Sequence, residues 1–257
     1  MEQKDPDQFL NFCCEMGRQL IENGAEIYRV EESADRLLAA YGYQEAEVFA
    51  IPAYIILNIQ DETRNYTKSV RIKTFSINLD KLDRLNALCR RVCQETPDVD
   101  AAYAQLREIM AAPTYPDKVG YLAYGFVALC FTLFWGGHAG DACVAFVCGI
   151  LVKATFAYMG KVNSNVFFTY VCASFFLVLP PMALTYLGTG IHIDKIVIGA
   201  IMLLVPGIAI TNVMRDVIAG DFLTAVMRFA EVMIIAMAIA IGIALPYSAA
   251  KMLLGAI

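Results

Sequence analysis

The chain has 257 residues, 58% of them hydrophobic, a formal net charge of −5 and a mean hydropathy of +0.55. This hydropathy is far above that of an ordinary soluble domain. Of the 20 basic and 25 acidic residues, 13 and 20 lie before residue 118, so the first part carries −7 and the rest +2. The imbalance predicts a water-soluble N-terminal part and a membrane-embedded C-terminal part, and the acidic first part argues against binding to nucleic acid.

Periodicity divides the first part into helices and strands. Four helices and three strands are predicted, the helices over residues 6–22, 25–40, 79–95 and 98–111 and the strands over residues 45–51, 53–60 and 68–77. Residues 1–116 are therefore predicted to form a small α+β domain with antiparallel strands. Its polar, acidic start lacks the basic and apolar regions of a secretory signal, so we expect this domain to stay in the cytoplasm.

The second part, residues 117–257, contains five apolar stretches. Each has about 18 to 25 residues, enough to cross roughly 30 Å of hydrocarbon as a helix. They lie at about 118–135, 140–160, 164–187, 195–219 and 222–245. With the N-terminal domain inside, most basic residues fall on internal connections. We therefore expect an α-helical integral protein of the plasma (inner) membrane with about five transmembrane helices, although the fourth stretch could instead be re-entrant.

The fourth stretch contains a run that is costly in lipid, LLVPGIAITNVMRDVIAGD at residues 203–221. Proline removes a helix hydrogen bond, and charged groups resist leaving water. Broken helices with polar groups at membrane depth are tolerated where they line a cavity or pathway. The predicted pathway residues here are Pro206, Gly207, Thr211, Asn212, Arg215, Asp216 and Asp221, with Arg215 for a substrate carboxylate, Thr211 and Asn212 for hydrogen bonds, and Asp216 or Asp221 for protons.

Other polar residues have two interpretations each. Glu231, near the start of the fifth stretch, could carry a coupled proton or form a local ion pair with Arg228. Lys153 fits an interfacial anchor better than a pathway residue. Glu26 and Arg29 could form a ligand or gating site, but their spacing favours a simple i,i+3 ion pair on a capped helix. Nothing in the sequence predicts a catalytic residue, a metal site or a cofactor.

With these residues the chain resembles the threonine/serine exporter (ThrE) family, in its shorter, split form. The similar stretches are LIENGAEIYRVEESADRLLAAYGY at 20–43, GGHAGDACVAFVCGILV at 136–152 and VIGAIMLLVPGIAITNVMRDVIAGDFLTAVMRFAE at 197–231. The family motif falls on Pro206, Gly207, Thr211, Asn212, Arg215, Asp216, Gly220 and Asp221, on Gly136, Gly137 and Asp141, and on Gly24, Glu26, Arg29 and Glu31.

The resemblance implies an exporter of small hydrophilic metabolites that is driven by the proton motive force. Threonine and serine are the first candidates, and a dicarboxylate such as succinate is the alternative cargo. It also implies an oligomer with a second, smaller membrane subunit that completes the transporter. A competing hypothesis is a non-transporting membrane sensor or scaffold whose soluble domain binds a ligand. An enzyme is not expected.

Overall fold

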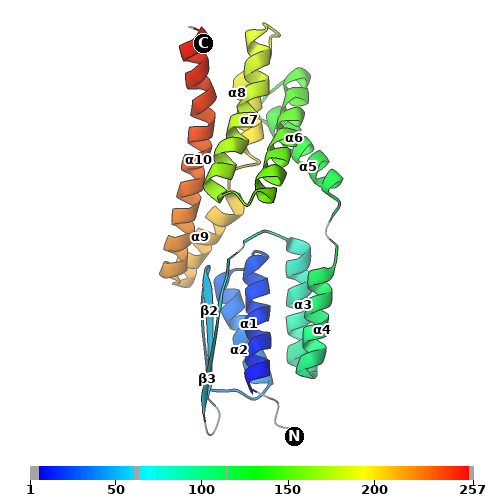
Figure 1. Cartoon of the computed structure of the whole chain (residues 1–257), viewed down its shortest axis with the longest axis vertical. Coiled ribbons are helices and arrows are strands. Elements are labelled where there is room, and N and C mark those ends of the chain that lie inside the picture. The colour runs from blue at the N-terminus through cyan, green and yellow to red at the C-terminus, as the bar shows by residue number, and fades with distance from the viewer. Residues whose placement is uncertain (1–5, 61–63, 74, 114, 255–257) are drawn as a thin grey trace. The chain divides into compact units, whose positions relative to one another are not determined.

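The computed structural model describes residues 6–60, 64–73, 75–113 and 115–254 and is mostly helical (Figure 1). Its contacts divide the chain into two compact units. The first unit comprises residues 1–113 and 211–228, and the second comprises residues 114–210 and 229–257. The chain therefore leaves the first unit, returns to it for one short segment of the predicted pathway, and leaves it again.

The first unit is built from helices and a small sheet. Its main elements are α1 (Pro6–Glu22), α2 (Ile27–Ala40), β1 (Ala46–Ile51), β2 (Tyr54–Gln60), β3 (Asn65–Arg71), α3 (Leu79–Glu95) and α4 (Val99–Ala111). The strands are antiparallel in the order β1-β2-β3. Helices α1 and α2 pack on the sheet, and α3 and α4 pack against α1, so the helix pair lies between the sheet and a second helical pair (Figure 1).

The apolar faces predicted for the first two helices form the core of this unit. Phe9, Phe12 and Met16 of α1 are fully buried, as are Ile55 and Leu57 of β2. Burying such a side chain contributes about 1.5–3 kcal/mol, so this face determines how α1 lies on the sheet. The periodicity of the sequence identified the face correctly, because each helix is apolar on one side only.

The third strand lies earlier in the chain than predicted, at residues 65–71 rather than 68–77. It pairs with β2 from Asn65 opposite Gln60 to Arg71 opposite Tyr54. Because β2 begins at Tyr54, later residues have no partner strand to pair with. The amide of Ile72 makes the last contact, donating to the carbonyl of Ala53 at 2.9 Å.

The described part of the second unit is built from helices. They are α5 (Asp117–Phe134), α6 (Ala139–Lys161), α7 (Val166–Tyr186), α8 (Ile193–Ile201) and the part of α10 (Phe222–Leu254) that follows residue 228. In the described part of the chain, four helices are long and apolar enough to cross a membrane: α5, α6, α7 and residues 222–252 of α10. Length and composition thus support an integral membrane protein, as the sequence predicts.

The fourth predicted stretch, 195–219, is divided into two short helices. Helix α8 ends at Ile201, and α9 runs from Gly207 to Ala219, so neither is long enough alone to span a bilayer. The break falls at Pro206, whose nitrogen has no hydrogen to donate to the preceding turn. Pro206 contributes to the start of α9, because its carbonyl accepts a hydrogen bond from the amide of Ile210 at 3.0 Å. The interruption predicted from the sequence is confirmed, and its place is the predicted one.

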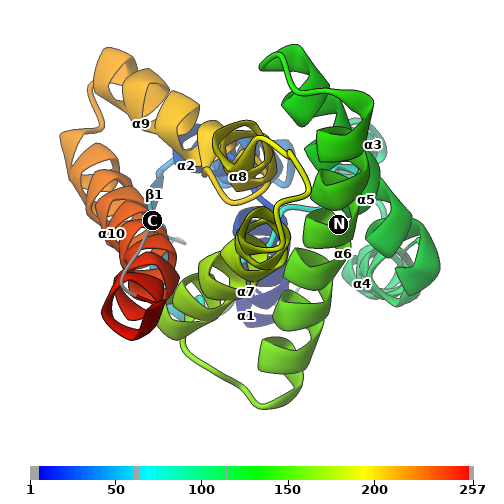
Figure 2. The same cartoon turned by 90° about the horizontal axis from the view of Figure 1, so that it is seen from above.

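Glycines set the spacing of the helices in the second unit. A Cβ on Gly149 of α6 would collide with the carbonyl of Tyr124 in α5, and one on Gly199 of α8 would collide with Thr132. Figure 2 shows α5, α6, α7 and α8 as neighbours. Small residues let membrane helices approach closely, where dispersion forces rather than the hydrophobic effect hold them together.

A buried carboxylate joins two loops of this unit. Asp141, at the start of α6, is 2% exposed. Its Oδ2 accepts from the amide of His138 and its Oδ1 from the amide of His192, both at 2.8 Å. The Nδ1 of His192 lies 3.0 Å from Oδ2, and the rings of the two histidines are in edge contact. Asp141 therefore fastens the α5–α6 loop to the start of α8.

Replacing Gly149 with alanine should destabilise the protein by about 1–3 kcal/mol, because α5 and α6 would have to separate. The matched control is Gly160→Ala on the same helix, where an added Cβ meets nothing within 4 Å. There we expect unchanged or slightly higher stability, since alanine favours helix. Thermal unfolding in detergent, followed by circular dichroism, measures both. Equal melting temperatures for the two variants would contradict the close packing.

Replacing Asp141 with alanine should leave the amides of His138 and His192 without this acceptor, at a cost of about 1.5–3 kcal/mol for each hydrogen bond to the charged carboxylate. Asp194→Ala is the control, because that carboxylate is 63% exposed and its ion pair is with the neighbouring Lys195, at 3.9 Å. We expect a clear drop in melting temperature for the first variant alone. If the melting temperature fell equally in Asp194→Ala, the effect of Asp141→Ala could not be assigned to the hydrogen bonds that join the two loops.

Candidate functional site

The charged end of the broken stretch lies against the start of α2, within the first unit. Arg215 of α9 forms an ion pair with Oε1 of Glu26, and the other oxygen of Glu26 lies 2.8 Å from Nε of Arg29. The Glu26 side chain is 12% exposed, whereas those of Arg215 and Arg29 are 47% and 64% exposed. Glu26 is thus a shielded carboxylate between two arginines, one local and one distant in sequence.

A second and deeper ion pair lies beside the first. Nε of Arg228, in the second turn of α10, is 3.4 Å from Oδ2 of Asp216, and both side chains are more than nine-tenths buried. The guanidinium of Arg228 also donates to the carbonyl of Ala25 at 3.3 Å. These contacts anchor α9 and the start of α10 to the residue that precedes Glu26.

The carboxylate of Asp216 is not fully satisfied by these contacts. Among the described residues, neither of its oxygens accepts a hydrogen bond, and the buried hydroxyl of Thr224 has no partner either. Asn212 is also buried and lies one turn before Asp216 on α9. Buried polar atoms almost always have partners, so this cluster has the capacity to accept a further donor.

Two more carboxylates adjoin the cluster. Asp221 accepts from the amide of Thr224 at 3.2 Å and caps the start of α10. Glu31 of α2 accepts from the amide of Ala50 at 2.8 Å. Burial raises the pKa of Glu31 above its usual range, and the negative charge of Asp221 adds to the rise, although the Ala50 hydrogen bond opposes it. The two acids therefore lie close enough to influence each other.

Two glycine turns hold these elements in place. Gly24 has φ +100° and ends α1, where the side chain of Asn23 donates to the carbonyl of Gln19 at 2.7 Å. Gly220 has φ +85° and reverses the chain between α9 and α10. Both conformations cost little only for glycine, so these turns explain why Ala25 and Asp221 reach the cluster.

The structure unites six of the predicted site residues in one cluster: Glu26, Arg29, Asn212, Arg215, Asp216 and Asp221. The predicted i,i+3 pair of Glu26 with Arg29 is confirmed. Two motif segments that are distant in sequence, 24–31 and 211–228, therefore form one ionic site.

Other predicted residues lie elsewhere. Pro206 and Gly207 form the helix break, and Thr211 has an exposed side chain at the edge of the first unit. Lys153 and Glu231 belong to the second unit, where the ammonium of Lys153 lies 5.5 Å from the ring centre of Tyr124. Gly136 and Gly137 form the loop before Asp141, and the carbonyl of Thr132 accepts from the amide of Gly137 at 2.9 Å.

Sequence reasoning missed Arg228 as a site residue. It was considered only as a local partner of Glu231, but Glu231 is exposed and the ion pair of Arg228 is with Asp216. The available signal was a single arginine inside an otherwise apolar run, which requires a compensating partner somewhere in the fold.

The chain matches a family model described as "putative threonine/serine exporter" over residues 11–249. It is 23% identical over 245 residues to a threonine/serine exporter of Corynebacterium glutamicum, covering 92% of this chain and 50% of that protein. A probable threonine/serine exporter of Mycobacterium tuberculosis is 22% identical over 237 residues, covering 91% and 45%. The chain thus spans about half the length of the curated relatives it matches. No solved structure matches it. Since the family model covers most of the sequence and includes both segments of the ionic cluster, the chain belongs to the threonine/serine exporter (ThrE) family.

Proposed function

We propose that the chain is a subunit of a secondary exporter that uses the proton motive force to move small hydrophilic metabolites out of the cytoplasm. Threonine and serine are the first candidates for the cargo, in keeping with the names of the relatives. The observation that carries the proposal is the ionic cluster, because it joins the soluble fold to a broken helix and to the start of a candidate span. A chain that only anchored a domain in the membrane would have no need of such an element.

The proposal includes partners and orientation. The relatives are about twice as long as this chain, and we propose that a separate, smaller membrane subunit supplies what the rest of those chains supplies. The complete transporter is then an oligomer in the plasma membrane. The first unit faces the cytoplasm, where the cargo is captured.

Each charged group has a role that suits its burial. Asp216, at 1% exposed and with no hydrogen bond to either oxygen among the described residues, suits a proton or the ammonium of an amino acid. Arg228 suits the carboxylate, because its buried guanidinium has a planar set of donors. Asn212 can bind the cargo hydroxyl. Arg215 is better suited to gating than to binding, since its half-exposed pair with Glu26 can open without leaving a buried charge alone.

Replacing Asp216 with asparagine should lower efflux of labelled threonine or serine from loaded cells by about ten-fold or more, because a charge-assisted contact of about 1.5–3 kcal/mol is lost. Asp194→Asn, an exposed carboxylate on α8, should change efflux by less than about two-fold. Membrane abundance of each variant is measured in parallel, and succinate efflux tests the alternative cargo. Normal efflux in Asp216→Asn at normal abundance would favour the sensor or scaffold hypothesis.

The pair of Glu26 with Arg215 can be tested by a double-mutant cycle. We expect Glu26→Gln and Arg215→Gln to change efflux in the same direction, and the double variant to differ little from either single one, because all three break the contact of Glu26 with Arg215. Glu26→Gln also weakens the local pair with Arg29, which the control variant measures separately. Arg29→Gln is the matched control, since it removes local contacts with Glu26 and Tyr28, the i,i+3 pair being worth about 0.2–0.5 kcal/mol, and leaves Arg215 in place. Additive effects of the two single changes would show that Glu26 and Arg215 act independently.

A further inference from the structure

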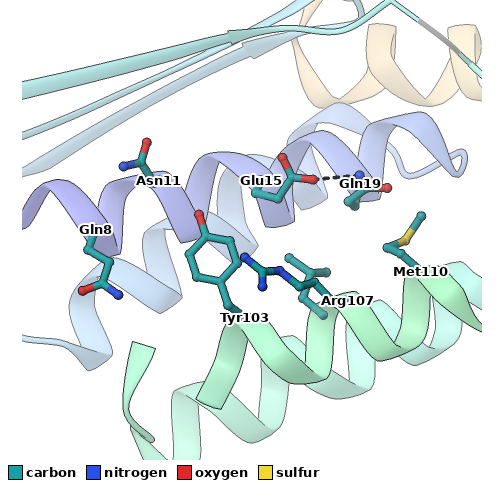
Figure 3. A pocket seen from close by; sticks show the side chains of 8 residues that line it. Gln8, Asn11, Glu15, Gln19, Tyr103, Arg107 and Met110 are labelled. Carbon is teal, nitrogen blue, oxygen red and sulfur yellow. Dashed lines mark hydrogen bonds between the residues drawn. The ribbon is translucent and has the colours of Figure 1, made fainter. Parts of the chain in front are cut away.

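The first unit contains a pocket that the ionic cluster does not use. It is a groove of about 480 Å³ between α1 and α4. Figure 3 shows its walls, which are formed by Gln8, Asn11, Glu15 and Gln19 of α1 and by Tyr103, Leu106, Arg107 and Met110 of α4. This volume is within the range of small-molecule sites. At one end, the amide of Gln8 donates to Asp100 at 2.6 Å and joins the two helices.

The α1 wall presents acceptors. Glu15 accepts from Arg18 at 2.5 Å. It also accepts from the side-chain amide of Gln19 at 2.9 Å (Figure 3). Gln19 is 6% exposed, and its carbonyl oxygen Oε1 has no partner among the described residues. A buried amide oxygen without a donor costs about 1–3 kcal/mol, so this wall is complementary to a ligand that donates hydrogen bonds.

The α4 wall presents a cation. The guanidinium of Arg107 lies 5.7 Å from the ring centre of Tyr103, and no carboxylate of the described residues pairs with it. Burial raises the pKa of Tyr103 to about 12, so its hydroxyl stays neutral. Leu106 and Met110 add apolar surface. This wall is therefore complementary to a carboxylate with a short apolar group beside it.

We propose that the groove between α1 and α4 binds a free amino acid as its zwitterion, with the carboxylate on Arg107 and the ammonium on Glu15 and Gln19. A dicarboxylate would place its second charge against Glu15, and a polyamine would place a cation against Arg107. A neutral amphoteric molecule satisfies both walls. A role in sensing the cargo rests on the proposed export function, but binding to the groove does not.

The experiment is hydrogen–deuterium exchange on the full chain in detergent, with L-threonine and L-serine as probes. We expect slower exchange in residues 6–22 and 99–111 when either amino acid is added. N-acetyl-L-threonine and L-threoninamide each lack one charge, and succinate lacks the ammonium. Each of these three should need a concentration about ten-fold higher or more, because one charge-assisted contact is lost.

Two variants locate the effect. Arg107→Gln changes an exposed residue and should abolish the protection without unfolding the chain, and Glu15→Gln should weaken it. Arg90→Gln, an exposed arginine of α3 outside the groove, should keep it. Absence of protection by either amino acid, or protection that persists in Arg107→Gln, would overturn the proposal. The export proposal is tested by a different measurement, the efflux of Asp216→Asn. Either proposal can therefore be contradicted while the other stands.

Discussion

The arrangement of the candidate site depends on the buried pair of Arg228 with Asp216. An arginine and an aspartate that are both nearly inaccessible to water lose much of their hydration energy, and the attraction between them offsets part of that loss. Removing one partner leaves a buried charge alone, which typically costs about 3–5 kcal/mol. The pair therefore explains why residues 211–228, which follow α8 and include the start of α10, belong by their contacts to the first unit. The donation of Arg228 to the carbonyl of Ala25 places Glu26 where Arg215 can reach it.

This constraint gives α10 two roles. Its first turns contain Thr224 and Arg228, which are part of the ionic cluster, and the same helix continues for a further 26 residues as the longest apolar segment of the chain. A helix transmits a displacement at one end along its length, because its backbone hydrogen bonds resist bending. If the cluster couples to transport as proposed, α10 is the continuous element that leads from it into the candidate span. Such coupling requires two alternative arrangements of the cluster. Arg215 is the part that can exchange its partner for water at least cost, because its side chain is half-exposed and Glu26 would keep its pair with Arg29.

Features that depend on residues close together in the chain were predicted from the sequence. Features that depend on contacts between distant residues were predicted less well. One-sided apolar helices such as α1, the break at Pro206 and the pair of Glu26 with Arg29 follow from spacing of a few residues. The bounds of β3 do not follow from local spacing, because they are set by the length of β2. The pairing of Arg215 with Glu26 and of Arg228 with Asp216 also required the fold. A local partner such as Glu231 is worth only about 0.2–0.5 kcal/mol, so a buried partner elsewhere in the fold takes precedence.

The two polar sites of the first unit share one physical property. In the cluster the oxygens of Asp216 lack donors, and in the groove the oxygen of Gln19 lacks one. Folded proteins rarely keep buried acceptors unsatisfied, since each lowers stability by about 1–3 kcal/mol. An arginine accompanies the acceptor in both places, Arg228 in the cluster and Arg107 in the groove. An amino-acid zwitterion, the ligand proposed for both places, would offer its ammonium to the acceptor and its carboxylate to the arginine. One kind of ligand would then suit two sites that share no residue.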